Sequence, residues 1–286
     1  RYLLEICNFG PHSFDDIHLV IDDIGNWLGA RVGLTPLEFR TNGLTRNGSG
    51  TTEDTLNVGE ASFIQFFAAG TIFKDVSFFS EIEFTTTGTA VAFGQVHMNF
   101  TNLWGSYANL QVGRVTPVEF TSFSDTKRSF KSSDILALRS SNNVGDNSSR
   151  VRGARPGISY YGYSGPVVWF AGIDNGADTT DTDTEKNYWV GARLDLPASM
   201  KTAFTGSSVS YHYYDGTDTS GTSTAQVQDD FVRHTVGLNI RHRSDSELQF
   251  VYQHGKDDNF TFAATPLEVN FDGYTIIGSH KRDNWY

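Results

Sequence analysis

Residues 57 to 120 read NVGEASFIQFFAAGTIFKDVSFFSEIEFTTTGTAVAFGQVHMNFTNLWGSYANLQVGRVTPVEF. The stretch contains four apolar-rich segments, at 61–73, 76–84, 91–104 and 108–120. Only two, six and three residues separate one segment from the next. Because a parallel crossover needs a dozen or more residues, segments joined this tightly must be antiparallel neighbours. The stretch therefore predicts a β-meander.

The second segment has an alternating side-chain pattern. Its even-numbered positions are mostly apolar, and its odd-numbered positions include the carboxylates Glu81 and Glu83. A period of two is typical of a strand with two different faces. A soluble sandwich would bury the apolar face, whereas a membrane barrel would turn that face to lipid and the polar face to a wet lumen. Alternation alone does not separate these two folds.

The composition describes a sheet protein rich in turns and aromatics, with 28 Gly, 22 Phe and 12 Tyr among 286 residues. A net charge of −11 argues against a nucleic-acid surface, which would be basic. No run of about 18 apolar residues exists, so no membrane helix is predicted. A membrane barrel is not excluded by this, because each of its strands has a much weaker hydrophobic signal than a membrane helix. The single cysteine, Cys7, excludes an intramolecular disulfide and a multi-cysteine metal site.

The links between predicted strands alternate in length along the whole chain. Together with the meander, further strands bring the total to about twelve, at 30–40, 155–163, 167–173, 187–196, 207–214, 231–243, 247–254 and 268–279. The links after odd-numbered strands are mostly long and polar: 43–55, 85–90, 121–154, 174–186, 215–230 and 255–267. The links after even-numbered strands are mostly short: 74–75, 105–107, 164–166, 197–206 and 244–246. Short turns at one end and long loops at the other are typical of outer-membrane barrels.

We therefore predict an all-β fold, an antiparallel transmembrane β-barrel of at least twelve strands with short periplasmic turns and long external loops. Residues 1–28 are predicted to be an irregular or helical N-terminal segment, and residues 29–286 the barrel. Residues 281–284 resemble a turn that leads into a further strand, so the barrel is expected to lack its last strands here. A soluble carbohydrate-binding β-sandwich is the alternative fold.

Three strings resemble a group of Gram-negative outer-membrane porins: LNVGEA at 56–61, GTIFKDVSFFSEIE at 70–83 and NLQVGR at 109–114. The group is loosely related to the phosphate-selective porins and is often associated with c-type cytochromes. The similarity covers roughly residues 56 to 160, and it implies a pore in the outer membrane, in contact with lipid and lipopolysaccharide. Some relatives carry a Cys-x-x-Cys-His haem motif; here Cys7 and His12 lack the second cysteine and the spacing, so no cofactor is predicted.

Basic residues concentrate in the link 121–154 and the residue after it. Seven of the 22 Lys and Arg lie there: Lys127, Arg128, Lys131, Arg139, Arg150, Arg152 and Arg155. If the link folds into the lumen, these charges narrow the pore with a positive field that faces Glu81 and Glu83, and charged rings set ion selectivity. The alternative is a solvated external loop with its charges in water or on lipopolysaccharide phosphates. Three further arginines on the polar faces of later strands could contribute to ion selectivity in the lumen: Arg193, Arg233 and Arg241. The alternative is that they only help to solvate a water-exposed wall.

No catalytic motif is recognisable. The acidic stretch 174–185 fails as an EF-hand because position 3 is Gly176 and the turn glycine is replaced by Thr179. The histidines lack metal-binding spacing, and His212 with Asp215 is the only candidate for a catalytic pair.

The chain is thus expected to be a non-enzymatic porin of the bacterial outer membrane that passes small polar or anionic solutes by diffusion and binds no nucleic acid. A barrel sheath around a c-type cytochrome is the alternative. Pores of this kind are commonly homotrimers, but the sequence shows no recognisable interface from which a trimer could be predicted.

Overall fold

The computed structural model describes residues 28–41, 54–85, 91–123, 126–127, 133–134, 136–138, 151–176, 184–200, 202–220, 227–243 and 245–280. The predicted N-terminal segment, apart from Leu28, and the predicted final turn lie outside these residues. Helix is limited to two 3-10 turns, η2 (Leu136–Leu138) and η3 (Ala198–Met200), within this part of the chain. None of the described helices has the length and apolar character needed to cross a membrane.

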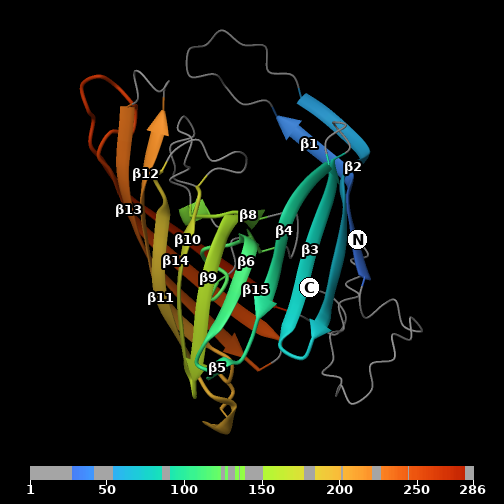
Figure 1. Cartoon of the computed structure of the whole chain (residues 1–286). Helices are drawn as coiled ribbons and strands as arrows, with labels where there is room; N and C mark the ends of the chain where they lie inside the picture. Colours follow the sequence, from blue (N-terminus) through green and yellow to red (C-terminus); the bar gives the residue numbers. More distant parts are fainter. Residues whose placement is uncertain are drawn as a thin grey trace. The chain divides into compact units, whose positions relative to one another are not determined.

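Twelve strands form one antiparallel sheet (Figure 1). They are β1 (Leu28–Thr41), β2 (Asp54–Phe73), β3 (Val76–Thr85), β4 (Val91–Phe100), β6 (Asn109–Val115), β9 (Arg155–Ser164), β10 (Val167–Asp174), β11 (Asn187–Asp195), β12 (Ser208–Ser220), β13 (Val227–His242), β14 (Ser246–Asp257) and β15 (Val269–His280). Each strand pairs with the next in this order. The prediction of a meander within an antiparallel sheet of about twelve strands is confirmed. Among the described residues no ladder joins β15 to β1, so the sheet is open and closure into a barrel is not observed.

Three short strands lie outside this sheet order. They are β5 (Leu103–Ser106), β7 (Thr126–Lys127) and β8 (Ser133–Asp134), of which the last two pair with each other.

Two predicted strands of the meander are shorter than expected. The strand at 91–104 is divided into β4 and β5, because Asn102 has a φ of 57° and so interrupts the extended backbone. The strand at 108–120 ends at Val115. Thr116 and Val118 accept turn hydrogen bonds from the backbone N–H groups of Glu119 and Thr121. Pro117 lies at this turn and lacks the N–H that a sheet ladder requires.

The two-residue turn between β9 and β10 has a glycine at the position that needs a positive φ. Ser164 pairs with Val167 across a two-residue turn, and Gly165 occupies its first position with a φ of 54°. A residue without a Cβ adopts this left-handed conformation at little cost. Hairpins of this length force neighbouring strands to be antiparallel, as observed.

The chain divides into two compact units, residues 1–96 and 97–286, and each is described by itself. In the second unit, β9 to β15 follow one another across a curved sheet (Figure 1). The core of this unit combines side chains from two sources: strand residues such as Phe170, Trp189 and Val251, and residues outside the sheet such as Val118 and Leu138. The core therefore lies between the inner face of the sheet and segments of the link that follows β6.

Candidate functional site: the polar inner face of the second unit

The inner face of the second unit is buried, and it carries many polar side chains beside the core residues Phe170, Trp189 and Val251. On β13 the side chains of Arg233 and Thr235 are 0% exposed, whereas Val236, on the opposite face, is 38% exposed. On β14 the amide side chain of Gln253 is fully buried, while that of its neighbour Tyr252 is partly exposed. The alternation predicted from the sequence is present, but the polar set is the covered one. This arrangement is the reverse of a soluble β protein, which covers its apolar face.

The outer face carries a continuous apolar band. Val209 pairs with Leu238, Leu238 with Phe250, and Phe250 with Ile276, so one row crosses four strands. Other exposed members on this face include Val112, Ile158, Val167, Val190, Leu194, Val236 and Leu248. Soluble monomers rarely expose a contiguous apolar surface of this extent. A band of this kind is typical of a surface that contacts another protein or a membrane.

Aromatic residues also lie on the outer face near the short turn that joins β9 to β10. The rings of Tyr107 and Trp169 stack with centroids 6.3 Å apart. The hydroxyl of Tyr160 donates to the backbone oxygen of Tyr107 over 2.6 Å and accepts from Trp169 Nε1 over 3.3 Å. These amphipathic rings have partners for their polar atoms at the edge of an apolar surface. Such girdles occur where barrel strands cross the lipid interface.

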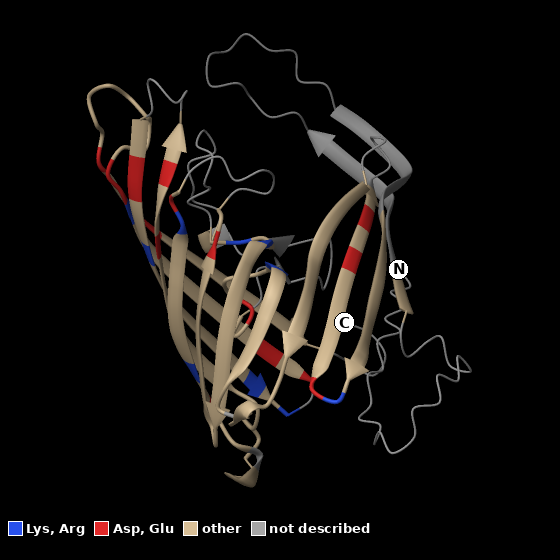
Figure 2. Ribbon diagram, in the orientation of Figure 1, with Lys and Arg blue, Asp and Glu red and all other residues tan. Residues whose placement is uncertain are grey.

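Toward the long loops, the band gives way first to aromatic and then to charged side chains. Tyr252 pairs with Tyr274, and the next outward-facing pair is His254 with Asp272. His254 Nδ1 lies 2.9 Å from Asp272 Oδ1. Figure 2 shows acidic residues near the loop ends of β12 and β13; of these, Asp215 and Asp230 alternate with buried residues and so lie on the outer face. The outer face is therefore layered from apolar to aromatic to charged along the strands.

Residues 116–123 leave β6 and lie on the inner face. Arg193 Nη1 on β11 donates to the backbone oxygens of Phe120 and Thr121 over 3.2 and 3.3 Å. The backbone N–H of Ser122 donates to Ser210 Oγ on β12 over 2.9 Å. The Phe120 ring stacks on Tyr161 of β9 at 4.3 Å. This stretch is thus attached to three strands of the inner wall.

A second part of the same link reaches the far strands. The backbone N–H of Ala137, in η2, donates to Thr275 Oγ1 on β15 over 2.8 Å. Ala137 and Leu138 are buried in the core. We call residues 116–123 and 136–138 together the inward segment. It contacts the inner wall from β9 to β15, which places residues 121–123 and 136–138 of the predicted 121–154 link on the polar side of the sheet.

The basic residues of that link are mostly outside the described residues. Arg128, Lys131 and Arg139 belong to this group, and only the backbone of Lys127, in β7, is described. In the first unit, Glu81 is buried on β3, and Glu83 on the same face accepts a hydrogen bond from Gln65 Nε2. The positive field expected to face these carboxylates stays a prediction.

The three strand arginines have different environments. Arg193 donates hydrogen bonds to the inward segment. Its Nε also lies 2.9 Å from Asp195 Oδ1. Arg233 Nη2 lies 2.8 Å from Asp257 Oδ1, and both side chains are fully buried. Arg241 is largely exposed at the short-turn end, 4.0 Å from Glu247. Only Arg193 and Arg233 therefore lie in the covered part of the inner face.

Arg233 has an unusual packing position. Its guanidinium lies over the ring of Phe231 at 5.2 Å and over the ring of Phe271 at 4.9 Å. Nη1 donates to the backbone oxygens of Val232 and Lys256. A planar, weakly hydrated cation suits such an aromatic site better than an ammonium would.

A buried polar network joins the loop ends of β9 to β12, and sequence reasoning missed it. Asn187 Nδ2 donates to Asp174 Oδ1 over 3.1 Å and to the hydroxyl of Tyr214 over 2.7 Å. Arg155 Nη1 also donates to Tyr214 and lies 3.9 Å from Asp174 Oδ1. The sequence pattern could have predicted part of this network, because strand alternation places Tyr214 on the same face as His212.

Three buried carboxylates beyond the apolar band were also missed. Asp218 pairs with Asp229 across β12 and β13, and Asp257 lies on β14. Burial raises the pKa of Asp229 to about 6, and the negative charge of Asp257 adds to the rise. The backbone N–H of Asn259, which donates to Asp229 Oδ1 over 2.7 Å, opposes the rise.

One minor site hypothesis does not fit the geometry. His212 is buried on the inner face, whereas Asp215 is on the opposite face of β12, so the two cannot form a catalytic pair. Asp174 faces the buried network and accepts from the N–H of Gly176 over 2.6 Å, and residues 177–183 of the acidic stretch lie outside the described residues. In the described ranges, no group of three His, Cys, Asp or Glu residues could hold a metal ion.

No protein-family model matches the sequence, and no curated protein is significantly similar to it.

Proposed function

We propose that this chain forms the wall of an outer-membrane β-barrel pore through which small polar or anionic solutes diffuse. The observation that best supports this proposal is the distribution of side chains in the second unit's sheet. Polar side chains lie on the covered face, and an apolar band lies on the exposed face. Water penalises this arrangement, because each Å² of apolar surface left wet costs roughly 25 cal/mol. A bilayer removes that cost, and an aqueous lumen solvates the polar wall.

The sheet form supports the same proposal. A spanning segment must satisfy its backbone N–H and C=O groups internally, which the antiparallel ladders do for the strands that lie between the edge strands β1 and β15. The strands from β9 to β15 have 8 to 16 residues. A tilted spanning strand needs about 9 to 11 residues, and all of these strands except β10, with 8 residues, reach that length.

The inward segment gives the pore its width. It is attached to the inner wall at β11, β12 and β15 by the hydrogen bonds of Arg193, Ser210 and Thr275. It therefore occupies space that a cytochrome inside a sheath would need, and this favours the pore over the sheath. No chemical step is involved, and the preference for anions rests on Lys127, Arg128, Lys131 and Arg139 of the same link.

Planar-bilayer recording of the detergent-purified protein, together with its visible spectrum, tests the proposal. We expect discrete conductance steps and no haem absorption band. A haem band without steps would identify the sheath instead. Extraction into buffer without detergent, with no steps after reconstitution, would rule out both and point to a soluble sandwich.

A further inference from the structure

Two histidines lie side by side on the outer face of the second unit. His234 on β13 pairs with His254 on β14, and their ring centroids are 6.4 Å apart. Both residues are partly exposed, and the His254 side chain is 44% exposed. The two residues come from different strands, so their spacing in the sequence does not reveal the pair.

Each imidazole is held through its Nδ1 atom. The hydroxyl of Tyr211 lies 2.7 Å from His234 Nδ1, and Asp272 Oδ1 lies 2.9 Å from His254 Nδ1. Asp272 is itself held by the hydroxyl of Tyr252, which donates to Oδ1 over 2.5 Å. Histidines that bind metal ions almost always donate their other ring N–H to a partner of this kind, which fixes the tautomer and the ring orientation.

The partners of the two rings lie on opposite sides of the pair. Tyr211 is on β12 and Asp272 is on β15, the strands that flank β13 and β14. Which imidazole nitrogen takes a metal ion is set by the hydrogen bond that the other nitrogen makes. The Nε2 atoms are thus left for a ligand shared between β13 and β14, and no hydrogen bond within the described part of the chain engages either of them.

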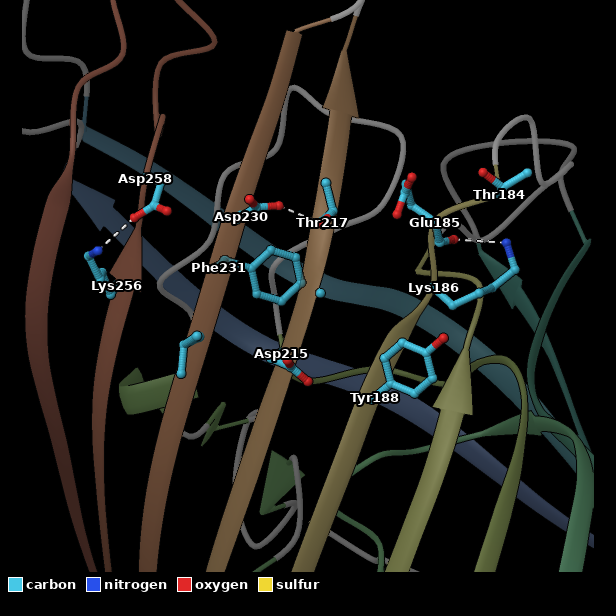
Figure 3. Close-up of a pocket in the computed structure, with 12 residues that line it drawn as sticks. Thr184, Glu185, Lys186, Tyr188, Asp215, Thr217, Asp230, Phe231, Lys256 and Asp258 are labelled. Atoms are coloured by element: carbon cyan, nitrogen blue, oxygen red, sulfur yellow. Dashed lines mark hydrogen bonds and ion pairs between the residues drawn. The ribbon is translucent and has the colours of Figure 1, made fainter.

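The surface next to the pair is acidic. The next outward-facing row toward the long loops contains Val232 and Lys256, and a groove of about 400 Å³ lies there (Figure 3). Its charged lining consists of four carboxylates and two lysines: Glu185, Asp215, Asp230, Asp258, Lys186 and Lys256. Lys256 is already paired with Asp258 and Glu268. A surface with an excess of negative charge raises the local concentration of cations.

The number and type of ligands indicate which ion fits. Imidazole nitrogen suits zinc, copper and nickel, whereas calcium and magnesium prefer oxygen ligands. A closed structural zinc site needs four protein ligands. Here the pair supplies two, because no group of three His, Cys, Asp or Glu in the described ranges could hold a metal ion. Water therefore completes the coordination of a bound ion.

We propose that His234 and His254 together bind one late transition-metal ion through their Nε2 atoms, with Tyr211 and Asp272 as positioning residues. The affinity follows the general order for nitrogen ligands, in which Cu²⁺ binds more tightly than Ni²⁺ or Zn²⁺. The ion joins neighbouring strands on the outer face. The site uses contacts within one sheet face, so it does not depend on the proposed pore.

Calorimetric titration of the metal-free, detergent-purified chain with Cu²⁺, Ni²⁺ or Zn²⁺, together with electron paramagnetic resonance of the Cu²⁺ form, tests this assignment. We expect a Cu²⁺ signal with two nitrogen ligands. His234→Gln and His254→Gln should each abolish that signal. His280→Gln is the matched control: His280 is also exposed and held through Nδ1, 2.9 Å from Ser246 Oγ, but it pairs with a serine. This variant should bind Cu²⁺ as the unmodified chain does.

Asp272→Asn tests the positioning of His254. The change keeps the shape of the side chain but removes the carboxylate, so the Cu²⁺ affinity should fall about tenfold. Asp230→Asn removes the same charge from the same face without touching either imidazole, and it should change the affinity much less.

An unchanged two-nitrogen signal in His234→Gln and His254→Gln would overturn the assignment. An equal loss of Cu²⁺ binding in His280→Gln would also overturn it and indicate unspecific binding to surface histidines. Equal effects of Asp272→Asn and Asp230→Asn would reject the positioning role of Asp272. Circular dichroism of each variant confirms that its sheet is intact.

Discussion

Phe123 of the inward segment lies directly over Gly237 of β13: a Cβ added at position 237 would be 2.2 Å from Phe123 Cδ1. No side-chain carbon can occupy that position without displacing the ring. The inward segment can therefore pack against β13 only because residue 237 is a glycine.

Gly237→Val should therefore dislodge the inward segment from β13. We expect a larger single-channel conductance, by roughly a factor of two, because the segment narrows the lumen in the proposed pore. Gly278→Val is the control, since nothing lies within 4 Å of an added Cβ there. Equal conductance of the two variants would show that the segment does not limit the pore.

Arg193→Gln should weaken the attachment of the inward segment to β11. The change removes charge-assisted hydrogen bonds to two backbone oxygens, so we expect a loss of about 1–3 kcal/mol in the free energy of unfolding. Arg241→Gln removes the same charge from an exposed position and should cost less than about 1 kcal/mol. Guanidinium unfolding in micelles, followed by circular dichroism, compares the two, and a similar loss in both would contradict the attachment.

Asp257→Asn should be strongly destabilising, because it leaves Arg233 buried without its partner. Loss of one member of a buried ion pair costs about 3–5 kcal/mol. Asp258→Asn, which alters the exposed pair with Lys256, should cost at most about 1 kcal/mol. The double change Arg233→Met with Asp257→Asn should recover much of the loss in the same unfolding experiment. If the single and double variants were equally unstable, the ion pair would not explain the effect.

The pH dependence of stability should include a contribution from Asp229. Its pKa is about 6 in the folded chain against an ordinary 3.8, so between these values the folded state binds more protons than the unfolded state. The stabilising contribution of Asp229 is therefore complete below about pH 4 and is lost as the pH rises to about 6.

Asp229→Asn removes this titration. Relative to the unmodified chain, the variant should gain stability as the pH rises from 4 to 6 and show no further change above pH 7. Unfolding midpoints at four pH values measure the difference. A difference that is constant with pH would show that Asp229 titrates normally.

Leu238→Arg tests the lipid-facing assignment of the apolar band. Arginine on the lipid face costs about 2–4 kcal/mol at the bilayer midplane and about 0–1 kcal/mol near its edges. Leu238 lies within the row that crosses four strands, and Val232, on the same face of β13, lies near the loop end of the band. Reconstituted Leu238→Arg should thus be much less stable than Val232→Arg. In a soluble protein the two would differ little, since both face water.

Local pattern was sufficient to predict the sheet. The alternation at 76–84 and the two-residue link at 74–75 require an antiparallel hairpin, since neither feature depends on distant residues. The same alternation predicted the polar faces of β11 and β13. It did not reveal that Arg193 binds backbone oxygens of the inward segment, because this contact joins residues more than 70 positions apart.

The strands, their antiparallel order and the separation of polar from apolar faces could be predicted from the amino-acid pattern, because they follow from a period of two and from short links. That the polar face is covered, and that residues 116–123 lie across it, became apparent from the folded chain. The folded chain also shows that Asp257 neutralises Arg233. These outcomes depend on which distant side chains meet at a curved sheet. They are set by the desolvation and packing of groups brought together by the fold rather than by neighbours in the chain.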